Sequence, residues 1–362
     1  MDKKLIKTGV LTDERMKPLL RYLNDENIID VDWNGSDLIV RDINNKSKKI
    51  PRTEHGITKE YIDSLTQHIA NTVSQSFTQD SPILDAETDK YRIQCIHEIA
   101  AISGRCIFIR KTTSTPRLKY DKLIKEMYCT EELLNLLINC CFAKFNIIIS
   151  GEPGIGKTEF GKFLCLFIPD DERVVTIEDT PEWHYKELKT NADGVELQVK
   201  GNFTYSKALR TCVRTTTSRV MISEVRSVEV KELIELWSSG VKGMTTMHCD
   251  DVRKIPDRIL NMMPTRLDAE RLENNVYENL DIGIVINQKE NKDGVKYRYI
   301  EQMCFFEREE GENKTILMVK DGKMINTDIP EVKLQKLSKA NITKPYTISE
   351  ELKERENGNK KA

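Results

Sequence analysis

The strongest constraint on this chain is the segment GEPGIGKT, residues 151–158, which joins two stretches of different periodicity. The preceding residues FNIIIS form a short apolar run that predicts a buried strand, and the following residues place phenylalanine and leucine on one stripe of a helix. A strand, a glycine-rich loop and a helix in this order are typical of sheets whose strands alternate with helices. We therefore predict an α/β domain with a mostly parallel sheet around this loop.

The loop matches the phosphate-binding pattern G-x-x-x-x-G-K-[S/T], and each fixed position has a chemical reason. Gly151, Gly154 and Gly156 let the backbone amides turn inward toward an anion. Lys157 can reach the terminal phosphates of a nucleoside triphosphate, and the hydroxyl of Thr158 can ligate Mg²⁺. A glycine turn without a ligand is the plain alternative. The other members of the predicted binding segment are Glu152, Pro153, Ile155 and Glu159.

Length and charge exclude several classes of protein. A chain of 362 residues is too long for one ordinary core, so we expect two domains. Its 56 Lys and Arg residues nearly balance 58 Asp and Glu residues, and no basic field exists to attract nucleic acid. The most apolar stretch, residues 133–149, is interrupted by Asn and Lys, which a lipid-embedded helix rarely contains. Neither a membrane span nor direct stable binding of nucleic acid is expected.

The first residues, MDKKLIKTGVLTDERMK, lack the apolar core of a signal peptide, so we expect a cytoplasmic protein. In that compartment its nine cysteines stay reduced. They include no CxxC pair, and the adjacent Cys140 and Cys141 fit a buried helix better than a metal site. Structural zinc is therefore not expected.

Residues 1–111 are predicted to form a smaller α+β domain. Residues 28–33 and 38–42 alternate around the turn NGSD, as the strands of a β-hairpin do. Residues 57–76 carry apolar side chains at helical spacing, and the segments RIQCIHEIA and RCIFIRK return to strand alternation. Residues 112–121 are polar and turn-forming and suit a linker.

Residues 122–330 are predicted to form the α/β domain that carries the glycine-rich loop. Helices and strands alternate there, which indicates a mostly parallel sheet covered on both faces. The predicted elements are a helix at 130–142, a strand at 146–150, a helix at 158–167, and strands at 174–178 and 220–223. Residues 331–362 become polar and charged and are predicted to form a flexible tail.

Three further segments narrow the function. They are VVTIEDTPEW (174–183), LRTCVRTTTSRVMISEVRSVE (209–229) and GMTTMHCDD (243–251). Together with GEPGIGKTEF they resemble the type II/type IV secretion ATPase superfamily, the traffic ATPases, in which they are called the Asp box, the Walker B region and the His box. The resemblance implies a RecA-like P-loop motor domain behind a smaller N-terminal domain.

Features outside the motor segments narrow the branch of the superfamily. The segments SPILDAETDKYRIQCI and GRCIFIRK resemble the N-terminal domain of the Tad/Cpa-type pilus ATPases and of the conjugation ATPases. The absence of a CxxC pair speaks against the zinc-bearing type II secretion and pilus-extension branch. The Tad/Cpa and conjugation branches are left.

The carboxylates of the Asp box lie just past a predicted strand, where a doubly wound sheet exposes its ligand site. The resemblance implies that Glu182 is the general base that orients the attacking water, and that Glu178 and Asp179 complete the Mg²⁺ shell. Solvated loop acids are the alternative, because acidic side chains are common on protein surfaces.

Glu224 follows a second apolar strand, and its carboxylate is expected to face Thr158 across the metal. The resemblance makes Glu224 the Walker B acid, with a metal-binding and catalytic role. The superfamily usually has Gly before this acid, where this chain has Ser223, a departure that leaves the end of the strand intact. His248 in the His box is expected near the terminal phosphate as a sensor of nucleotide, and a packed structural histidine is the alternative.

Arginine forks best stabilise the negative charge that develops in phosphoryl transfer. Arg210 and Arg214 precede the Walker B acid at helical spacing and are catalytic candidates. Arg92, Arg105 and Arg110 lie on or beside strands of the N-terminal domain, as nucleotide contacts do in the resembling superfamily. Among these three, Arg110 is the first candidate for a catalytic role, and the other two are candidates for nucleotide binding. An exposed surface arginine is the alternative at each position.

The resemblance implies a motor that hydrolyses ATP with Mg²⁺ and turns closure of its N-terminal domain into work. It also implies a homohexameric ring at the inner face of the cell membrane, docked on platform or channel proteins of a type IV secretion, conjugation or Tad-type pilus system. Two alternatives from other classes stay open. They are a nucleotide-gated scaffold without turnover and a DNA helicase or translocase.

Overall fold

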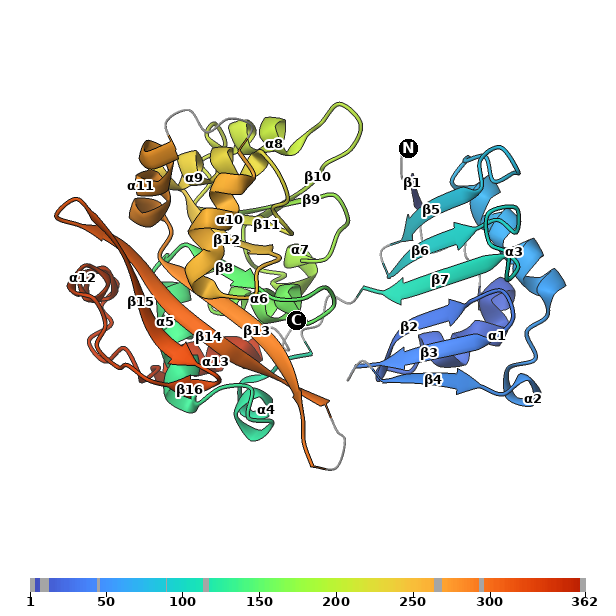
Figure 1. Cartoon of the computed structure of the whole chain (residues 1–362), viewed down its shortest axis with the longest axis horizontal. Helices are drawn as coiled ribbons and strands as arrows, with labels where there is room; N and C mark the ends of the chain where they lie inside the picture. Colours follow the sequence, from blue (N-terminus) through green and yellow to red (C-terminus); the bar gives the residue numbers. More distant parts are fainter. Residues whose placement is uncertain are drawn as a thin grey trace. The chain divides into compact units, whose positions relative to one another are not determined.

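The protein is described from a computed structural model in which contacts divide the chain into two compact units, residues 1–113 and 114–362 (Figure 1). The described residues are 4–6, 13–43, 46–88, 90–112, 117–263, 269–292 and 296–358. Among them, no helix combines the length and the apolar character needed to cross a membrane.

The smaller unit is an α+β structure built on one sheet. In its described part the sheet has seven strands in the order β1-β5-β6-β7-β2-β3-β4. The strands are β1 (Lys4–Ile6), β2 (Ile28–Trp33), β3 (Leu38–Asp42), β4 (Ser47–Ile50), β5 (Ile83–Thr88), β6 (Tyr91–Ile96) and β7 (Cys106–Lys111). The helices are α1 (Asp13–Leu23), α2 (Arg52–His55) and α3 (Lys59–Thr72). Helices α1 and α3 share a single apolar core with the strands.

Local sequence explains the elements of this unit. Strands β2 and β3 are antiparallel, and the side chain of Asn34 accepts backbone N–H bonds from Ser36 and Asp37 in the turn between them. The hydroxyl of Thr58 caps helix α3 by accepting from the amide of Tyr61. The predicted hairpin is confirmed, and the predicted helix at 57–76 is present in a shorter form.

The larger unit contains the second sheet, which has nine strands in its described part. Their order is β10-β9-β11-β12-β8-β13-β14-β15-β16. The strands are β8 (Ile147–Ser150), β9 (Val174–Glu178), β10 (Gly194–Gln198), β11 (Arg219–Ile222), β12 (Lys242–Met247), β13 (Ile282–Glu290), β14 (Lys296–Glu309), β15 (Glu312–Lys320) and β16 (Lys323–Met324). All pairs from β10 to β13 are parallel, and β13 to β16 pair antiparallel. The predicted α/β class is confirmed, with an antiparallel extension that the sequence analysis did not predict.

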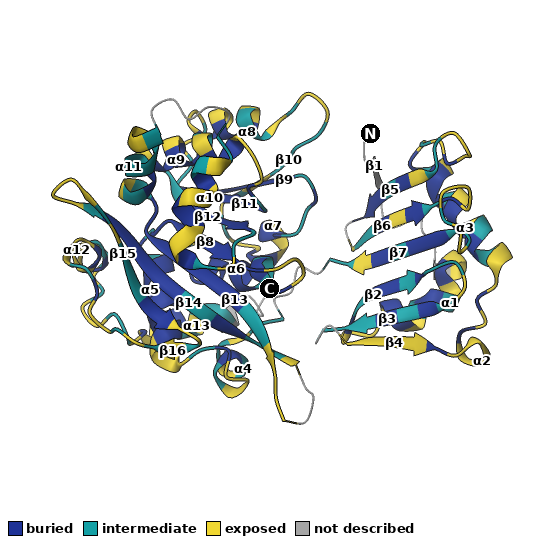
Figure 2. Ribbon diagram, viewed as in Figure 1, coloured by how far each residue is buried: buried dark blue, intermediate teal, exposed yellow. Residues whose placement is uncertain are grey.

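Helices cover both faces of this sheet, so its central strands are buried (Figure 2). Alternation along β8 sends Ile147 and Ile149 to one core and Ile148 to the other. The first core includes α5 (Glu131–Phe142), α6 (Lys157–Cys165), α7 (Tyr185–Leu188), α12 (Glu331–Lys339) and α13 (Glu350–Gly358). The second includes α8 (Tyr205–Cys212), α9 (Glu229–Ser238), the short 3₁₀ helix η1 (Val252–Lys254), α10 (Ile255–Asn261) and α11 (Ala269–Asn279).

The end of the described chain corrects the predicted flexible tail at 331–362. Residues 331–339 and 350–358 are helices, and Leu337 and Leu352 lie in the first core. Lys333 and Lys336 bind Asp281 at the start of β13, with N–O distances of 2.7 and 2.5 Å. The charges that indicated a solvated tail therefore have a buried partner.

The predicted linker at 112–121 lies partly outside the described residues. Residues 113–116 belong to the part that is not described, and residues 120 and 121 begin helix α4 (Tyr120–Lys125).

The Asp281 cluster generates a prediction about stability. Burial raises the pKa of Asp281, but Lys333 and Lys336 overcome this effect and hold the pKa below its ordinary value. Asp281→Ala leaves the charges of Lys333 and Lys336 without their buried carboxylate partner. The substitution is expected to lower the free energy of unfolding by about 3 kcal/mol. A pKa that is lower in the folded state stabilises the fold at neutral pH, and this contribution is lost as the pH falls below about 4.

The measurement is urea unfolding of the full chain in a Trp33→Phe background, in which Trp183 and Trp237 report on the larger unit. The control is Glu235→Ala, which removes an exposed pair with Lys231 and is expected to cost at most about 0.5 kcal/mol. Equal unfolding midpoints for the two variants would show that the cluster does not hold the C-terminal helices in place.

Candidate functional site

Four loops meet at one edge of the larger sheet because they follow neighbouring parallel strands. In strand order they follow β9, β11, β12 and β8, and they are the Asp box, the Walker B segment, the His box and the glycine-rich loop. The register pairs Ile177 with Ile222, Ile222 with Thr245, and Met247 with Ser150, so the strands end at nearly the same level. The carboxyl edge of such a sheet is where ligands bind.

The backbone of the glycine-rich loop needs its glycines. Gly151, Gly154 and Gly156 all have positive φ, a conformation that side chains disfavour. A Cβ on Gly151 would lie 2.5 Å from the carbonyl oxygen of Ile286 on β13, so the loop sits close against the neighbouring strand. Ile155 is buried in the first core and anchors the loop from within.

Lys157 folds back onto its own loop. Its ammonium donates to the carbonyl oxygens of Gly151 and Glu152, each at 3.0 Å. Burial lowers the pKa of Lys157 to about 8, while Glu224 and Glu182 act to raise it. The charge is therefore held by carbonyl dipoles, which phosphate oxygens can replace.

The Asp box places the side chain of Glu182 against the first turn of helix α6. The hydroxyl of Thr158 donates to Oε2 of Glu182 at 2.9 Å. Trp183, which is fully buried, packs where a Cβ on Gly161 of α6 would lie, so the glycine allows the close approach. The loop is thereby held against the helix that carries Thr158.

Glu178 makes contacts with the backbone of that loop. One of its oxygens accepts N–H bonds from Glu182 at 2.8 Å and from Trp183 at 3.0 Å. Burial raises the pKa of Glu178 to about 8, and the two amide bonds reduce this shift. These contacts shape the loop that carries Glu182, and the metal role expected for Glu178 stays a prediction.

The Walker B acid and the His box form one charged network with the glycine-rich loop. Nε2 of His248 lies 2.8 Å from Oε1 of Glu224, and Nδ1 lies 3.0 Å from the carbonyl oxygen of Gly151. Nδ1 is also 3.3 Å from the ammonium of Lys157. The imidazole of His248 therefore lies between the Walker B acid and the loop.

Arg226 is a residue of this network that the sequence analysis missed. Its guanidinium donates to Glu224 at 2.7 Å and to Asp179 at 3.3 Å. The hydrogen bond to Glu224 is the main cause that raises the pKa of Arg226. The signal was its place two residues after the Walker B acid in the same loop.

The structure does not bring the arginines predicted on the larger unit into this network. Arg210 pairs with Glu232 on helix α9 at 3.1 Å and is highly exposed. Arg214 is exposed and follows the end of helix α8. Their expected catalytic role gains no contact from the described structure.

The arginines predicted on the N-terminal domain all lie in the smaller unit. Arg105 is largely buried against Glu98 and Asp63. Arg110 donates to Asp30 at 2.8 Å and pairs in register with Arg92 on the neighbouring strand. The expected contacts of Arg92, Arg105 and Arg110 with nucleotide stay a prediction.

The residues present suit a magnesium ion that relies on phosphate and water for most of its ligands. Mg²⁺ is usually held by one or two carboxylates together with substrate phosphates. Among the described residues no group of three or more His, Cys, Asp and Glu side chains is placed to hold a metal ion. The hydroxyl of Thr158 is the metal ligand that the loop itself offers, and the carboxylate of Glu182 lies within hydrogen-bond distance of it.

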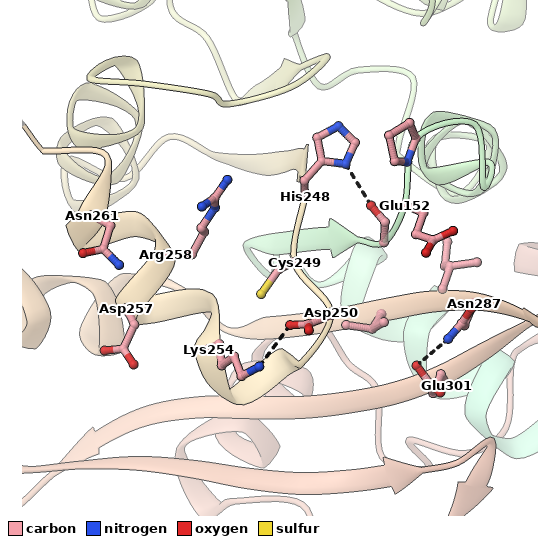
Figure 3. Close-up of a pocket in the computed structure, with 14 residues that line it drawn as sticks. Glu152, His248, Cys249, Asp250, Lys254, Asp257, Arg258, Asn261, Asn287 and Glu301 are labelled. Carbon is pink, nitrogen blue, oxygen red and sulfur yellow. Dashed lines mark hydrogen bonds and ion pairs between the residues drawn. The ribbon is translucent and has the colours of Figure 1, made fainter.

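A cavity of about 650 Å³ opens beside the start of the loop (Figure 3). One wall is formed by Gly151, Glu152 and Pro153 and by the segment that begins at His248. The other walls come from helix α10 and from strands β13 and β14. The cavity therefore borders the end of the loop at which Lys157 and His248 meet.

Comparison with known proteins agrees with the geometry of these four loops. The family described as "Type II/IV secretion system protein" matches residues 81–289, which is more than half of the chain and includes all four loops. The chain belongs to this family. The match within the type II/IV secretion family also includes strands β5 to β7 of the smaller unit.

Individual relatives share moderate identity with this type II/IV secretion family member. It is 30% identical over 288 residues to an uncharacterized protein of Bacillus anthracis. It is 26% identical over 296 residues to the type IV secretion system protein VirB11 of Brucella suis, covering 72% of this chain and 80% of that protein. The match with the Bacillus protein covers 78% of this chain and 63% of that protein. The chain spans only 39% of an uncharacterized protein of Methanocaldococcus jannaschii.

Solved structures show the same fold at low identity. The ATPase DotB of Yersinia pseudotuberculosis has a TM-score of 0.63 at 14% identity, with 92% of this chain and 84% of that chain covered. The pilus retraction motor PilT, solved with ADP, has a TM-score of 0.60 at 16% identity, with 89% and 86% covered. These likenesses support the fold of the secretion family member.

The contacts of Glu178 generate a prediction about pH. A carboxyl whose pKa is raised to about 8 in the folded state stabilises the fold at low pH, and this contribution is lost as the pH rises through that value. Glu178→Gln keeps an oxygen for the two amides and cannot ionise. The variant is expected to match the wild type within about 1 kcal/mol near pH 5 and to exceed its stability by at least about 1 kcal/mol near pH 9.

Thermal and urea unfolding at the two pH values measure this difference. Glu187→Gln on helix α7 is the control, because Glu187 is exposed, and its stability is expected to follow the wild type at both values. A constant difference between Glu178→Gln and the wild type across this range would contradict a neutral Glu178 at low pH.

Proposed function

We propose that this chain binds Mg²⁺ and ATP at the four loops of the larger unit, hydrolyses the ATP, and supplies the energy to a secretion or pilus-assembly machine. Membership of the type II/IV secretion family supports the general role. The observation that carries the proposal is the continuous set of contacts from Glu224 through His248 to Lys157 and the loop backbone. These groups come from three neighbouring strands and meet where a terminal phosphate would bind.

In the proposed mechanism, Lys157 exchanges the carbonyl oxygens of Gly151 and Glu152 for phosphate oxygens. Glu182, which contacts Thr158, accepts the proton of the attacking water as general base. His248 transmits the occupancy of the terminal phosphate position to Glu224 through their 2.8 Å contact. When bound, Mg²⁺ would be held by Thr158 with Glu182 and Glu224 nearby and would neutralise charge on the phosphates.

The finer role is also a proposal. We propose that the working form is a homohexamer at the inner face of the cell membrane, and that it serves a conjugation, type IV secretion or Tad-type pilus system. The similarity to a protein named as a type IV secretion component, VirB11, supports this assignment. The arginines of the smaller unit, with Arg110 first, would reach the nucleotide when the units close, and Asp179 would support the metal shell.

Two substitutions separate binding from turnover. Lys157→Ala is expected to abolish nucleotide binding, because it removes the charge that faces the terminal phosphates. Glu182→Gln is expected to leave ADP and ATP affinity within about threefold of the wild type and to lower kcat by roughly 10²- to 10⁴-fold. Calorimetric titration with ADP and a steady-state phosphate-release assay measure the two effects.

The control for these substitutions is Glu187→Gln, an exposed glutamate five residues further along, which is expected to leave both binding and kcat unchanged. Wild-type binding of ATP without any phosphate release would favour a nucleotide-gated scaffold. Full turnover in Glu182→Gln would show that another group activates the water.

Assembly is tested separately by light scattering after size exclusion. In the Glu182→Gln background with ATP and Mg²⁺, the expected mass is near six times the 41.8 kDa of one chain. Lys157→Ala under the same conditions is expected to form less of this species, because it cannot bind nucleotide. Monomer alone at micromolar concentration, with nucleotide bound, would contradict the ring.

A further inference from the structure

Strand β14 carries an arginine to the glycine-rich loop from a distant part of the chain. Strand β13 pairs with β8 only as far as Val285 and Ser150, and then continues beyond the end of β8. Over this extension β13 pairs with β14, and Arg298 of β14 lies opposite Gln288. Arg298 therefore sits past the end of β8, at the level where the loop begins.

The side chain of Arg298 lies against the last glycine of the loop. A Cβ on Gly156 would meet Nη1 of Arg298 at 3.8 Å, Cδ at 3.9 Å and Cζ at 4.0 Å, which are ordinary van der Waals distances. Gly156 has a φ of 99° and directly precedes helix α6, whose first amides face an incoming anion. The guanidinium thus adds a full positive charge at the Gly156 end of the anion site.

A buried hydroxyl lies in the same neighbourhood. Tyr128 is buried and stacks on Phe160 of helix α6 with ring centroids 5.6 Å apart. Its hydroxyl has no hydrogen-bond partner among the described residues. Burial raises the pKa of Tyr128, and the charge of Arg298 opposes this shift while that of Glu159 adds to it. The charged side chains of Arg298 and Glu159 therefore act on this hydroxyl beside the start of helix α6.

The two ends of the loop differ in what surrounds them. Lys157 and His248 meet at the carbonyl oxygen of Gly151, with Glu224 next to them. The groups assigned to cleavage of the terminal phosphate, Glu182, Glu224 and His248, follow β9, β11 and β12, which lie on one side of β8 in the sheet. Arg298 lies on β14, on the other side of β8. Under the proposed function, the guanidinium of Arg298 then faces the phosphates nearer the ribose, on the side of the loop away from those groups.

We propose that Arg298 is a nucleotide-binding residue that contacts the inner phosphates, the part that ATP and ADP share. This inference rests on the proposed function, because it needs a nucleotide at the loop. Arg298 is a binding residue in this scheme, since it contacts the nucleotide away from the bond that breaks. Its contribution to the binding free energy is expected to be equal for ATP and ADP, because both ligands carry the phosphates that it contacts.

The test is the affinity for nucleotide, measured by calorimetric titration of the full chain with ADP, and with ATP in the Glu182→Gln background. Arg298→Ala is expected to weaken both ligands by about tenfold or more, by the same factor, because it removes a charged hydrogen-bond donor. Arg298→Lys keeps a point charge, and its affinity for each nucleotide is expected to lie between that of the wild type and that of Arg298→Ala. In steady state KM is expected to rise while kcat changes by less than about threefold.

The matched control is Lys289→Ala on the neighbouring strand. Lys289 stacks over Tyr299 at 4.2 Å, and Tyr299 follows Arg298 on the strand and so faces the other side of the sheet. This variant loses the same charge at the same end of the sheet and is expected to bind both nucleotides as the wild type does. Circular dichroism and melting temperature confirm that each variant is folded.

The outcomes separate this inference from the proposed function. If Lys157→Ala abolishes ADP binding while Arg298→Ala binds ADP and ATP as the wild type does, Arg298 has no nucleotide role and the proposed function stands. If Arg298→Ala weakens ATP but not ADP, Arg298 acts on the terminal phosphate and the assignment to the inner phosphates is wrong. If the wild type binds neither nucleotide, both proposals fail.

Discussion

The alignment of three parallel strands by Asn146 is the constraint on which the candidate site depends. The side chain of Asn146 donates to the carbonyl of Asn279 at 2.6 Å and accepts from the amide of Gly243 at 3.1 Å. Its backbone amide donates to Asp281 at 2.7 Å. One buried polar residue thus ties the starts of β12, β8 and β13 together through hydrogen bonds inside the protein. Because the starts are aligned, the loops at the opposite ends of these strands meet.

The charged side chains at the carboxyl edge of the sheet have partners of opposite charge or polarity in the described structure. Lys157 rests on carbonyl oxygens, and Arg226 and His248 share the two oxygens of Glu224. Charged groups taken out of water are costly unless they are paired, so these contacts keep the site ready before a ligand binds. Under the proposed function, a bound phosphate would replace the carbonyl contacts of Lys157, and His248 would carry this change to the Walker B loop. Arg226 extends the connection to Asp179, so side-chain contacts link all four loops.

The sequence predicted the parts of the structure that depend on local pattern. Apolar runs predicted the strands before Gly151 and Glu224, and glycine spacing predicted the loop, because both patterns reflect short-range geometry. The antiparallel extension of the sheet was missed, since β14 alternates only weakly and gains its place from pairing with β13. The helices after residue 331 were missed for a similar reason. Their lysines read as solvated charges, and only the fold shows that Asp281 lies beneath them.

Contacts between residues far apart in the sequence determine which arginines lie near the glycine-rich loop and how the loop is positioned, and neither could be predicted from local pattern. The order of strands decides which arginines come close to the loop, and Arg226 and Arg298 could not be ranked above Arg210 without it. A Cβ on Gly151 would clash with the carbonyl oxygen of Ile286, so the position of β13 limits where the backbone of the loop can lie. Asp281 directly precedes strand β13, and Lys333 and Lys336 of helix α12 hold its carboxylate. The packing of residues 331–339 therefore supports the geometry of the candidate nucleotide site, because the same strand carries the ion cluster at one end and borders the loop at the other.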